Sequence, residues 1–260
     1  QINGTTGYEE AAAQGILAGI NAGLRHRGTP PWVPARSEAY IGVLVDDLVT
    51  RGTSEPYRMF TSRAEHRLLL REDNADERLT PTGRELGLVD EERWRLFEAK
   101  RSAIGAELSR LERRRFKPGQ IPAAWANRVL GGAAPSREVS AFDLLRRPEV
   151  GYAALLELLD PADGTAAAAD DRLAGQVQRA IEVRASYAGY IERAQAEIER
   201  TQAQQGAMLP ADMDYAALAG LSTEIRQKLA QIRPATLGQA ARVPGVTPAA
   251  ISILIVHLRR

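Results

Sequence analysis

The chain has 260 residues, of which 44% are hydrophobic, 26% are charged and only 5% are aromatic, and its formal net charge is +1. These values are typical of soluble globular proteins and exclude an overall polycation, so a nucleic-acid site would have to be a local patch. The chain has no cysteine, which excludes disulfides, thiolate catalysis and cysteine-ligated metal sites.

The first predicted element is a helix from about residue 7 to residue 24. Thr6 followed by Glu9 has the spacing of a capping box, and alanines and glycines follow on one face. A glycine-containing turn before a helix offers backbone N–H groups to an anion or to a polar ring edge. By itself the pattern favours a tightly packed helix with an ordinary cap over a cofactor contact.

The second predicted helix follows a proline-rich loop at residues 25–34. Ser37 is expected to cap it, and it should run through Leu48 and stop near Gly52. Asp46 and Asp47 on this helix could form a catalytic pair, but a solvated helix face is the favoured interpretation.

Residues 57–60 and 67–71 are predicted as short strands, and residues 73–82 as turns. This stretch carries many arginines: Arg51, Arg58, Arg63, Arg67, Arg71 and Arg78. Acidic residues lie between them, so the cluster is either a phosphate-contacting surface or a salt-bridged one. Tyr57, Phe60 and His66 add rings on which an unpaired base could stack.

Helical periodicity dominates the rest of the chain. Amphipathic helices are predicted for residues 90–115 and for residues 170–204, the second capped by Asp170, with a low-complexity linker at 159–169. The basic residues at 110–117 suit a helix C-terminus whether or not they also contact RNA.

Short helices are predicted after Pro210. Residues 242–247 join two of them, and they fit a helix-hairpin-helix turn and a plain αα corner equally well. The apolar run that follows suggests that residues from about Leu221 onward form a separate module with a docking surface. No histidine, aspartate and glutamate spacing is typical of a metal site.

Several long motifs resemble one family. They are residues 1–11 (QINGTTGYEEA), 34–40 (PARSEAY), 42–48 (GVLVDDL), 55–65 (EPYRMFTSRAE) with its continuation to 76, and 246–254 (VTPAAISIL). The chain resembles the flavin-binding subunit of the bacterial tRNA-uridine 5-carboxymethylaminomethyl modification enzyme, the MnmG/GidA or glucose-inhibited division protein A family. The likeness runs end to end but is looser over 112–170, and His66 stands where many relatives have tyrosine.

The resemblance implies a fold and a domain plan. The family's Gly-x-Gly-x-x-Gly turn and reactive cysteines are absent here, so we expect the C-terminal portion of a larger protein. The expected fold is mainly α: a multi-helical C-terminal domain with a short N-terminal remnant of the FAD-binding domain. The expected segments are 1–75 (end of the FAD-binding domain and connection), 76–210 (helical domain) and 211–260 (C-terminal helical subdomain for partner and tRNA docking).

The resemblance also implies a chemistry. In the family, FAD with NADH and methylene-tetrahydrofolate serves to install the carboxymethylaminomethyl group at C5 of the tRNA wobble uridine, with a GTPase partner. We expect a cytoplasmic protein that is a homodimer when full-length, has no membrane segment, and is inactive as this portion alone. The alternatives are a non-catalytic helical adaptor that binds RNA or protein, and a relative of the folate-dependent tRNA uridine methyltransferases.

Site residues follow from the same resemblance, and no catalytic residue or metal ligand is expected. The expected cofactor contacts are Gln1, Asn3, Gly4, Thr5 and Thr6. The expected nucleic-acid contacts are Arg36, Arg58, Arg63, Arg67 and Arg71. The expected partner contacts are Val246, Ile251, Leu254 and Ile255.

Overall fold

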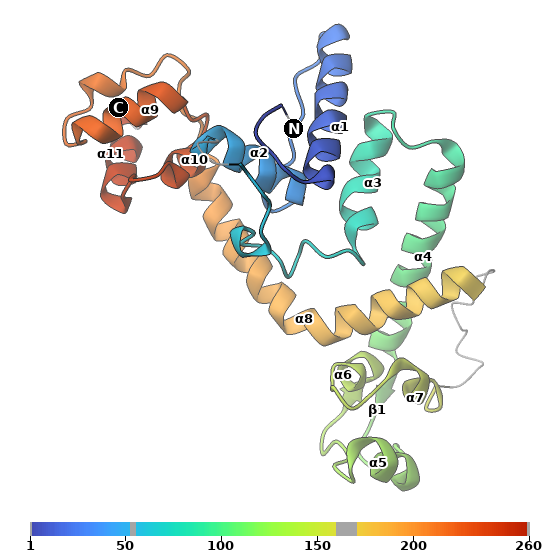
Figure 1. The fold of residues 1–260 in the computed structure, drawn as a ribbon. Helices are drawn as coiled ribbons and strands as arrows, with labels where there is room; N and C mark the ends of the chain where they lie inside the picture. The colour runs from blue at the N-terminus through green and yellow to red at the C-terminus, as the bar shows by residue number, and fades with distance from the viewer. Residues whose placement is uncertain (1, 53–55, 160–170, 259–260) are drawn as a thin grey trace. The chain divides into compact units, whose positions relative to one another are not determined.

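The fold, given by a computed structural model, is mainly α-helical, as predicted, and only a two-stranded antiparallel sheet accompanies the helices in the described part of the chain (Figure 1). The structure describes residues 2–52, 56–159 and 171–258, and for residues 171, 195 and 197–205 it describes the backbone alone. The chain divides into two compact units, Gln1–Leu70 with Ala194–Arg260, and Arg71–Arg193. The first and last segments expected from the sequence therefore share one unit.

The first unit is built from short helices. They are α1 (Tyr8–His26), α2 (Tyr40–Arg51), the 3-10 helices η1 (Thr61–Arg63) and η3 (Tyr215–Ala217), α9 (Thr223–Ile232), α10 (Leu237–Arg242) and α11 (Pro248–Leu258). The predicted boundaries of α1 hold within two residues, but its capping box is wrong. Gly7 is the N-cap and has no side chain with which to cap, and the backbone N–H of Thr6, which Glu9 would bind in a capping box, donates to the carbonyl of Tyr57, 3.2 Å away.

The second helix begins later than predicted. Its N-cap is Ala39, because residues 35–39 form a turn in which the backbone N–H of Glu38 and Ala39 donates to the carbonyl of Ala35. The helix ends at Gly52, as expected, where φ is +70° and glycine is favoured.

The predicted strands around residue 60 are wrong. Tyr57 forms only an isolated parallel bridge with Thr5, and residues 65–69 form turns after the 3-10 helix η1. The predicted turns at 73–82 are also wrong, because α3 (Ala75–Glu85) occupies them with Pro81 inside the helix.

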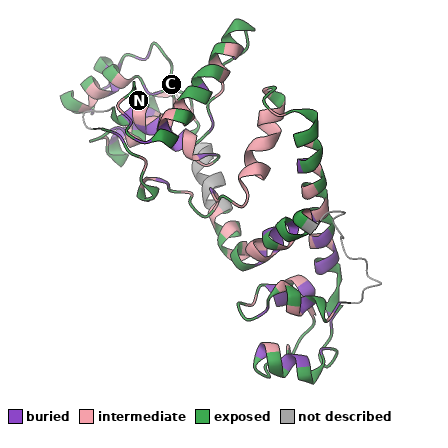
Figure 2. Cartoon of the chain, turned by 45° about the vertical axis from the view of Figure 1, so that its right-hand side comes forward, coloured by how far each residue is buried: buried purple, intermediate pink, exposed green. Residues whose placement is uncertain are grey.

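The second unit has its own aliphatic core. Its elements are α3, α4 (Glu91–Arg113), β1 (Arg115–Phe116), α5 (Ala123–Leu130), β2 (Val139–Ser140), α6 (Ala141–Leu145), α7 (Tyr152–Leu156) and α8 (Asp171–Gln205), the last of which contributes to both units. Asp90 is the N-cap of α4, and Ile104 and Leu111 on its periodic face are almost fully buried. Figure 2 shows buried positions on α4 and α6, whereas α3 has none. The predicted cap Asp170 and most of the linker at 159–169 lie outside the described residues.

The C-terminal helices share a core that starts before Leu221. Buried apolar side chains run from Leu209 through Leu229 to Leu254. This module is not separate from the rest of its unit, because Arg242 makes two hydrogen bonds of 2.6 and 2.8 Å to Asp46 on α2. In the described ranges, no helix is long and apolar enough to span a membrane.

Candidate functional site

The N-terminal strip is fixed to α1 through one glutamine. The side chain of Asn3 donates to Gln14 Oε1 at 2.7 Å, and Gln14 Nε2 donates to the hydroxyl of Thr5 at 2.9 Å. The backbone N–H of Tyr57 donates to the carbonyl of Gly4 at 2.8 Å. The strip is thus held on both sides, and Gln14 was not predicted because its partners lie more than two helical turns away in sequence. Gln1, the first expected cofactor contact, lies outside the described residues.

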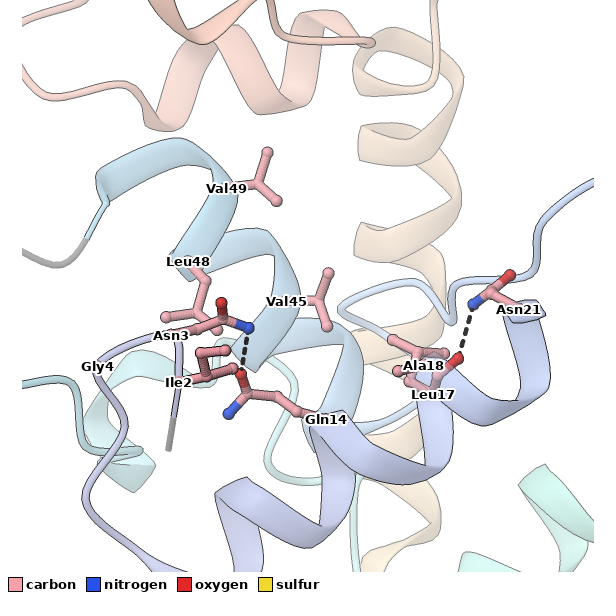
Figure 3. Close-up of a pocket in the computed structure, with 10 residues that line it drawn as sticks. All are labelled: Ile2, Asn3, Gly4, Gln14, Leu17, Ala18, Asn21, Val45, Leu48 and Val49. Atoms are coloured by element: carbon pink, nitrogen blue, oxygen red, sulfur yellow. Dashed lines mark hydrogen bonds between the residues drawn. The ribbon is translucent and has the colours of Figure 1, made fainter.

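A pocket of about 800 Å³ opens between this strip, α1 and α2 (Figure 3). Its apolar lining includes Leu17 and Ala18 of α1 and Val45 of α2, and the amide groups of Asn3, Gln14 and Asn21 lie beside them. The ten lining residues include no charged side chain. The pocket therefore suits a flat apolar ring with polar edges better than it suits a phosphate.

The N-terminus of α1 is occupied by a carboxylate of its own helix. A Cβ at Gly7 would lie 1.5 Å from Glu10 Oε2, so only glycine leaves the carboxylate this place. Glu10 is buried and accepts a 3.1 Å hydrogen bond from the backbone N–H of Met59. That hydrogen bond is the main cause that lowers the pKa of Glu10. The helix dipole is therefore already partly compensated by Glu10.

Replacement of Glu10 by glutamine should reduce stability in a pH-dependent way. A carboxyl whose pKa is lowered on folding stabilises the fold above its ordinary pKa of 4.5, and this stabilisation is lost as the pH falls through the folded-state pKa. The difference in unfolding free energy between wild type and Glu10→Gln should therefore be largest at neutral pH and shrink below about pH 4.5. Urea unfolding at a series of pH values measures it, and a pH-independent difference would contradict the assignment.

Arg36 lies at the centre of a buried ion-pair network. Its guanidinium donates to Asp47 at 2.8 Å, to Asp46 at 3.0 Å and to Glu65 at 2.9 to 3.2 Å, and also to the carbonyls of Val43 and Arg63. Its side chain is 9% exposed, and Asp47 is fully buried. Burial opposes the charge, but the bonds to Glu65 and Asp47 outweigh it and raise the pKa of Arg36.

This network corrects the expectation that Asp46 and Asp47 are solvated, and it bears on the expectation that Arg36 contacts nucleic acid. Asp46 and Asp47 are not on a solvated helix face, and because both are paired with arginines they are not a free acid–base pair either. Arg36 has no donor left for a phosphate while the network is closed, so the structure gives it a scaffolding role. The sequence contained no signal for this, because Arg36 and Glu65 are 29 residues apart.

Tyr57 and Arg63 complete the network on the side of residues 56–65. The hydroxyl of Tyr57 donates to Asp47 at 3.1 Å, and burial, with the charge of Asp47, raises the pKa of Tyr57 to about 12. The guanidinium carbon of Arg63 lies 5.0 Å from the ring centroid of Tyr57 and 5.8 Å from that of Phe60. Arg63 is about one-third exposed, so its side chain is partly accessible.

The other expected nucleic-acid contacts differ in their surroundings. Arg58 and Arg67 are exposed, and neither forms a salt bridge with any residue that the structure describes. Arg71 belongs to the other unit, where it makes a bidentate pair with Asp73. The accessible cations of the first unit in this region are thus Arg58, Arg67 and, in part, Arg51 and Arg63.

The expected partner contacts divide between surface and core. Leu254 is fully buried in the C-terminal core, so it cannot contact a partner unless the module opens, and this expectation is corrected. Val246, Ile251 and Ile255 are partly buried against the same core, whereas Val256 is 57% exposed.

Three family models match the chain. Residues 91–195 match the tRNA modifying enzyme MnmG/GidA C-terminal helical domain, residues 197–260 match the C-terminal helical bundle of the same enzyme, and residues 1–30 match glucose inhibited division protein A.

Two solved structures of GidA from Aquifex aeolicus resemble the chain over nearly its whole length. The form II crystal gives a TM-score of 0.81 at 38% identity and covers 99% of this chain, and the form I crystal gives 0.76 at 38% identity and covers 98%. This chain spans 39% and 38% of those two chains.

Proposed function

The chain belongs to the MnmG/GidA family of tRNA-modifying enzymes and corresponds to its C-terminal portion, and we propose that it supplies tRNA binding and partner docking to a flavoenzyme that modifies the wobble uridine. The observation that carries the proposal is the match of residues 91–195 and 197–260 to two C-terminal helical models of this enzyme. In the proposal the finished group is carboxymethylaminomethyl at C5, and the docked partner is a GTPase subunit.

The residues near the N-terminus fit one edge of FAD and not the whole cofactor. The pocket beside Asn3 and Gln14 has apolar walls and amide edges, which suit a flavin ring, but its lining has no cation for the diphosphate. Asn3 and Gly4 are the residues we propose as contacts, whereas the hydroxyl of Thr5 is buried and already accepts from Gln14. When bound, FAD would take reducing equivalents from NADH or methylene-tetrahydrofolate and carry the one-carbon unit.

The residues of this chain position groups and do not themselves react. The Arg36 network fixes residues 56–65 on α2, and it thereby holds Tyr57 and Arg63 in place. Arg58 and Arg67 are left free to approach a phosphate, since phosphate contacts orient a nucleic acid without reading its bases. We thus propose that the buried Arg36 network positions this segment, and that the exposed Arg58 and Arg67 contact the phosphates.

A flavin spectrum and tRNA binding test the proposal together. The purified chain should be colourless, should bind tRNA, and should give no wobble-uridine conversion with GTPase, folate and NADH supplied. A stoichiometric yellow flavin would contradict the proposal that this chain contacts only one edge of FAD. Absence of tRNA binding would contradict the proposed function. The helical adaptor is the second candidate, and it would bind tRNA but bind no GTPase subunit of this enzyme class.

Arg58→Ala and Arg67→Ala should weaken tRNA binding without unfolding the chain. Each arginine that neutralises a phosphate releases counterions, so its loss should reduce the slope of log affinity against log salt by about one. Fluorescence anisotropy with labelled tRNA, in salt from about 50 to about 200 mM, measures this slope. Arg101→Ala, at an exposed arginine paired with Glu98, is the matched control. An unchanged slope with a lower melting temperature would assign both arginines to the fold.

A further inference from the structure

Two exposed tyrosines on α8 each have an arginine over the ring. Tyr187 is 39% exposed, and the guanidinium carbon of Arg71 lies 5.6 Å from its ring centroid. Tyr190 is 56% exposed, and the guanidinium carbon of Arg193 lies 5.0 Å from its ring centroid. Both distances fall within the range of about 6 Å over which a cation is attracted to a ring face. All four residues belong to the unit Arg71–Arg193.

The two rings share one side of the helix, because residues three apart on a helix are neighbours on its surface. The tyrosine–arginine face is defined as Tyr187, Tyr190, Arg71 and Arg193. Arg146 is not part of it, because its Nη2 would lie 3.5 Å from a Cβ at Gly189, and residues one or two apart on a helix do not share a face.

We propose that the tyrosine–arginine face binds a single-stranded segment of RNA by stacking unpaired bases on Tyr187 and Tyr190. Surfaces that hold single strands combine exposed aromatic rings, which stack bases of any sequence, with cations that follow the backbone. A guanidinium over one side of each ring leaves the exposed remainder of that ring to a base. This inference rests on the proposed function, and it specifies that a loop or an end of the tRNA, with its bases unpaired, lies on this face.

Charge and polarity favour RNA over a protein partner. Hot spots of protein interfaces lie in desolvated surroundings from which charged residues are depleted. Here the neighbours of the two rings on α8 include the exposed Ser186 and Arg193. Arg71 shares its charge with Asp73, which leaves Arg193 as the other cation of the face. Stacking, more than net charge, should therefore carry the affinity.

Binding of a labelled oligouridylate and of a tRNA transcript by the full 260-residue chain tests the proposal. Tyr187→Ala and Tyr190→Ala should each weaken oligouridylate binding about 5- to 150-fold, which corresponds to the loss of one stacked base. Tyr190→Phe keeps the ring and should retain most of the affinity. Tyr8→Ala is the matched control, since Tyr8 is 86% exposed on α1 and lies outside the face. Far-UV circular dichroism of every variant checks the fold.

The outcomes separate this inference from the proposed function. If wild type binds tRNA and both alanine variants bind both RNAs as tightly as Tyr8→Ala, the face is not an RNA site and the proposed function stands. If the wild-type chain binds neither RNA, both the proposed function and this inference are contradicted. If RNA binding is unchanged but the alanine variants alter the sedimentation of the chain, the face is a protein contact and the inference is overturned. Should an alanine variant unfold, Arg193→Ala replaces it and should lower the salt slope by about one, and an unchanged slope would overturn the inference.

Discussion

Arg36→Ala should lower the unfolding free energy of the first unit by about 3 to 5 kcal/mol, because it removes one partner of a buried ion pair and leaves the other charged. Asp47 is fully buried, and without Arg36 its nearest cations are Arg51 and Arg63, at 3.8 and 3.9 Å. The two backbone carbonyls that accept from Arg36 would lose this donor as well. Arg36→Lys should also destabilise, since an ammonium cannot reproduce the planar fork.

The measurement must resolve the two units, because a chain with more than one unit need not unfold in one step. Native-state hydrogen exchange of the α2 amides reports on the first unit alone. Arg95→Ala, at a 73% exposed arginine 4.0 Å from Glu91, should change stability by less than about 0.5 kcal/mol and is the control.

A second variant identifies the cause. One cause of a lower unfolding free energy in Arg36→Ala would be that the charge on Asp47 is left without its partner. In that case Asp47→Asn should lower the unfolding free energy less in the Arg36→Ala background than it does in the wild type. Additive losses, or a loss below about 1 kcal/mol for Arg36→Ala, would show that the network is not the element that holds residues 56–65 to α2.

The sequence predicted the long helices because their signals are local. The three-four spacing from Phe97 to Leu111 lies within α4 itself, and the structure has a helix over it. The helix α3 escaped prediction because its support is not local. Asp76 pairs with Lys100 on α4, and Glu77 pairs with Arg184 on α8. These contacts offset the poor helix propensity of a segment with Pro81 in its interior.

In the candidate site, too, contacts between residues far apart in sequence could not be predicted. The resemblance pointed to one stretch of chain, but it could not rank the arginines within it. Arg36 and Arg58 are the same residue type in equally specific motifs, yet the first is enclosed by carboxylates and the second is exposed. Only the path of the chain decides which carboxylates surround a given arginine. Likewise, the paired rings of Tyr187 and Tyr190 stand out only once Arg71, more than one hundred residues earlier, is placed over Tyr187.

Gly42→Ala should destabilise the first unit by about 1 to 3 kcal/mol or more, although alanine is the better helix former. Gly42 is buried in the first turn of α2, and a Cβ there would lie 2.4 Å from each of the carbonyl oxygens of Pro34 and Ala35. Backbone atoms cannot rotate away as a side chain can, so the turn at residues 34–36 would have to move. That turn carries Arg36, so the displacement would also open the ion-pair network.

The matched control is Gly19→Ala in α1, where a Cβ would meet nothing within 4 Å. Gly19 is an exposed position in a helix interior, so alanine should stabilise the chain there by about 0.5 to 1 kcal/mol. The same chemical change should thus act in opposite directions at two helical glycines, which thermal unfolding and α2 hydrogen exchange can measure in parallel. If both variants are stabilised, α2 does not pack against the turn as closely as described. In that case the contact at Gly42 does not help to position Arg36.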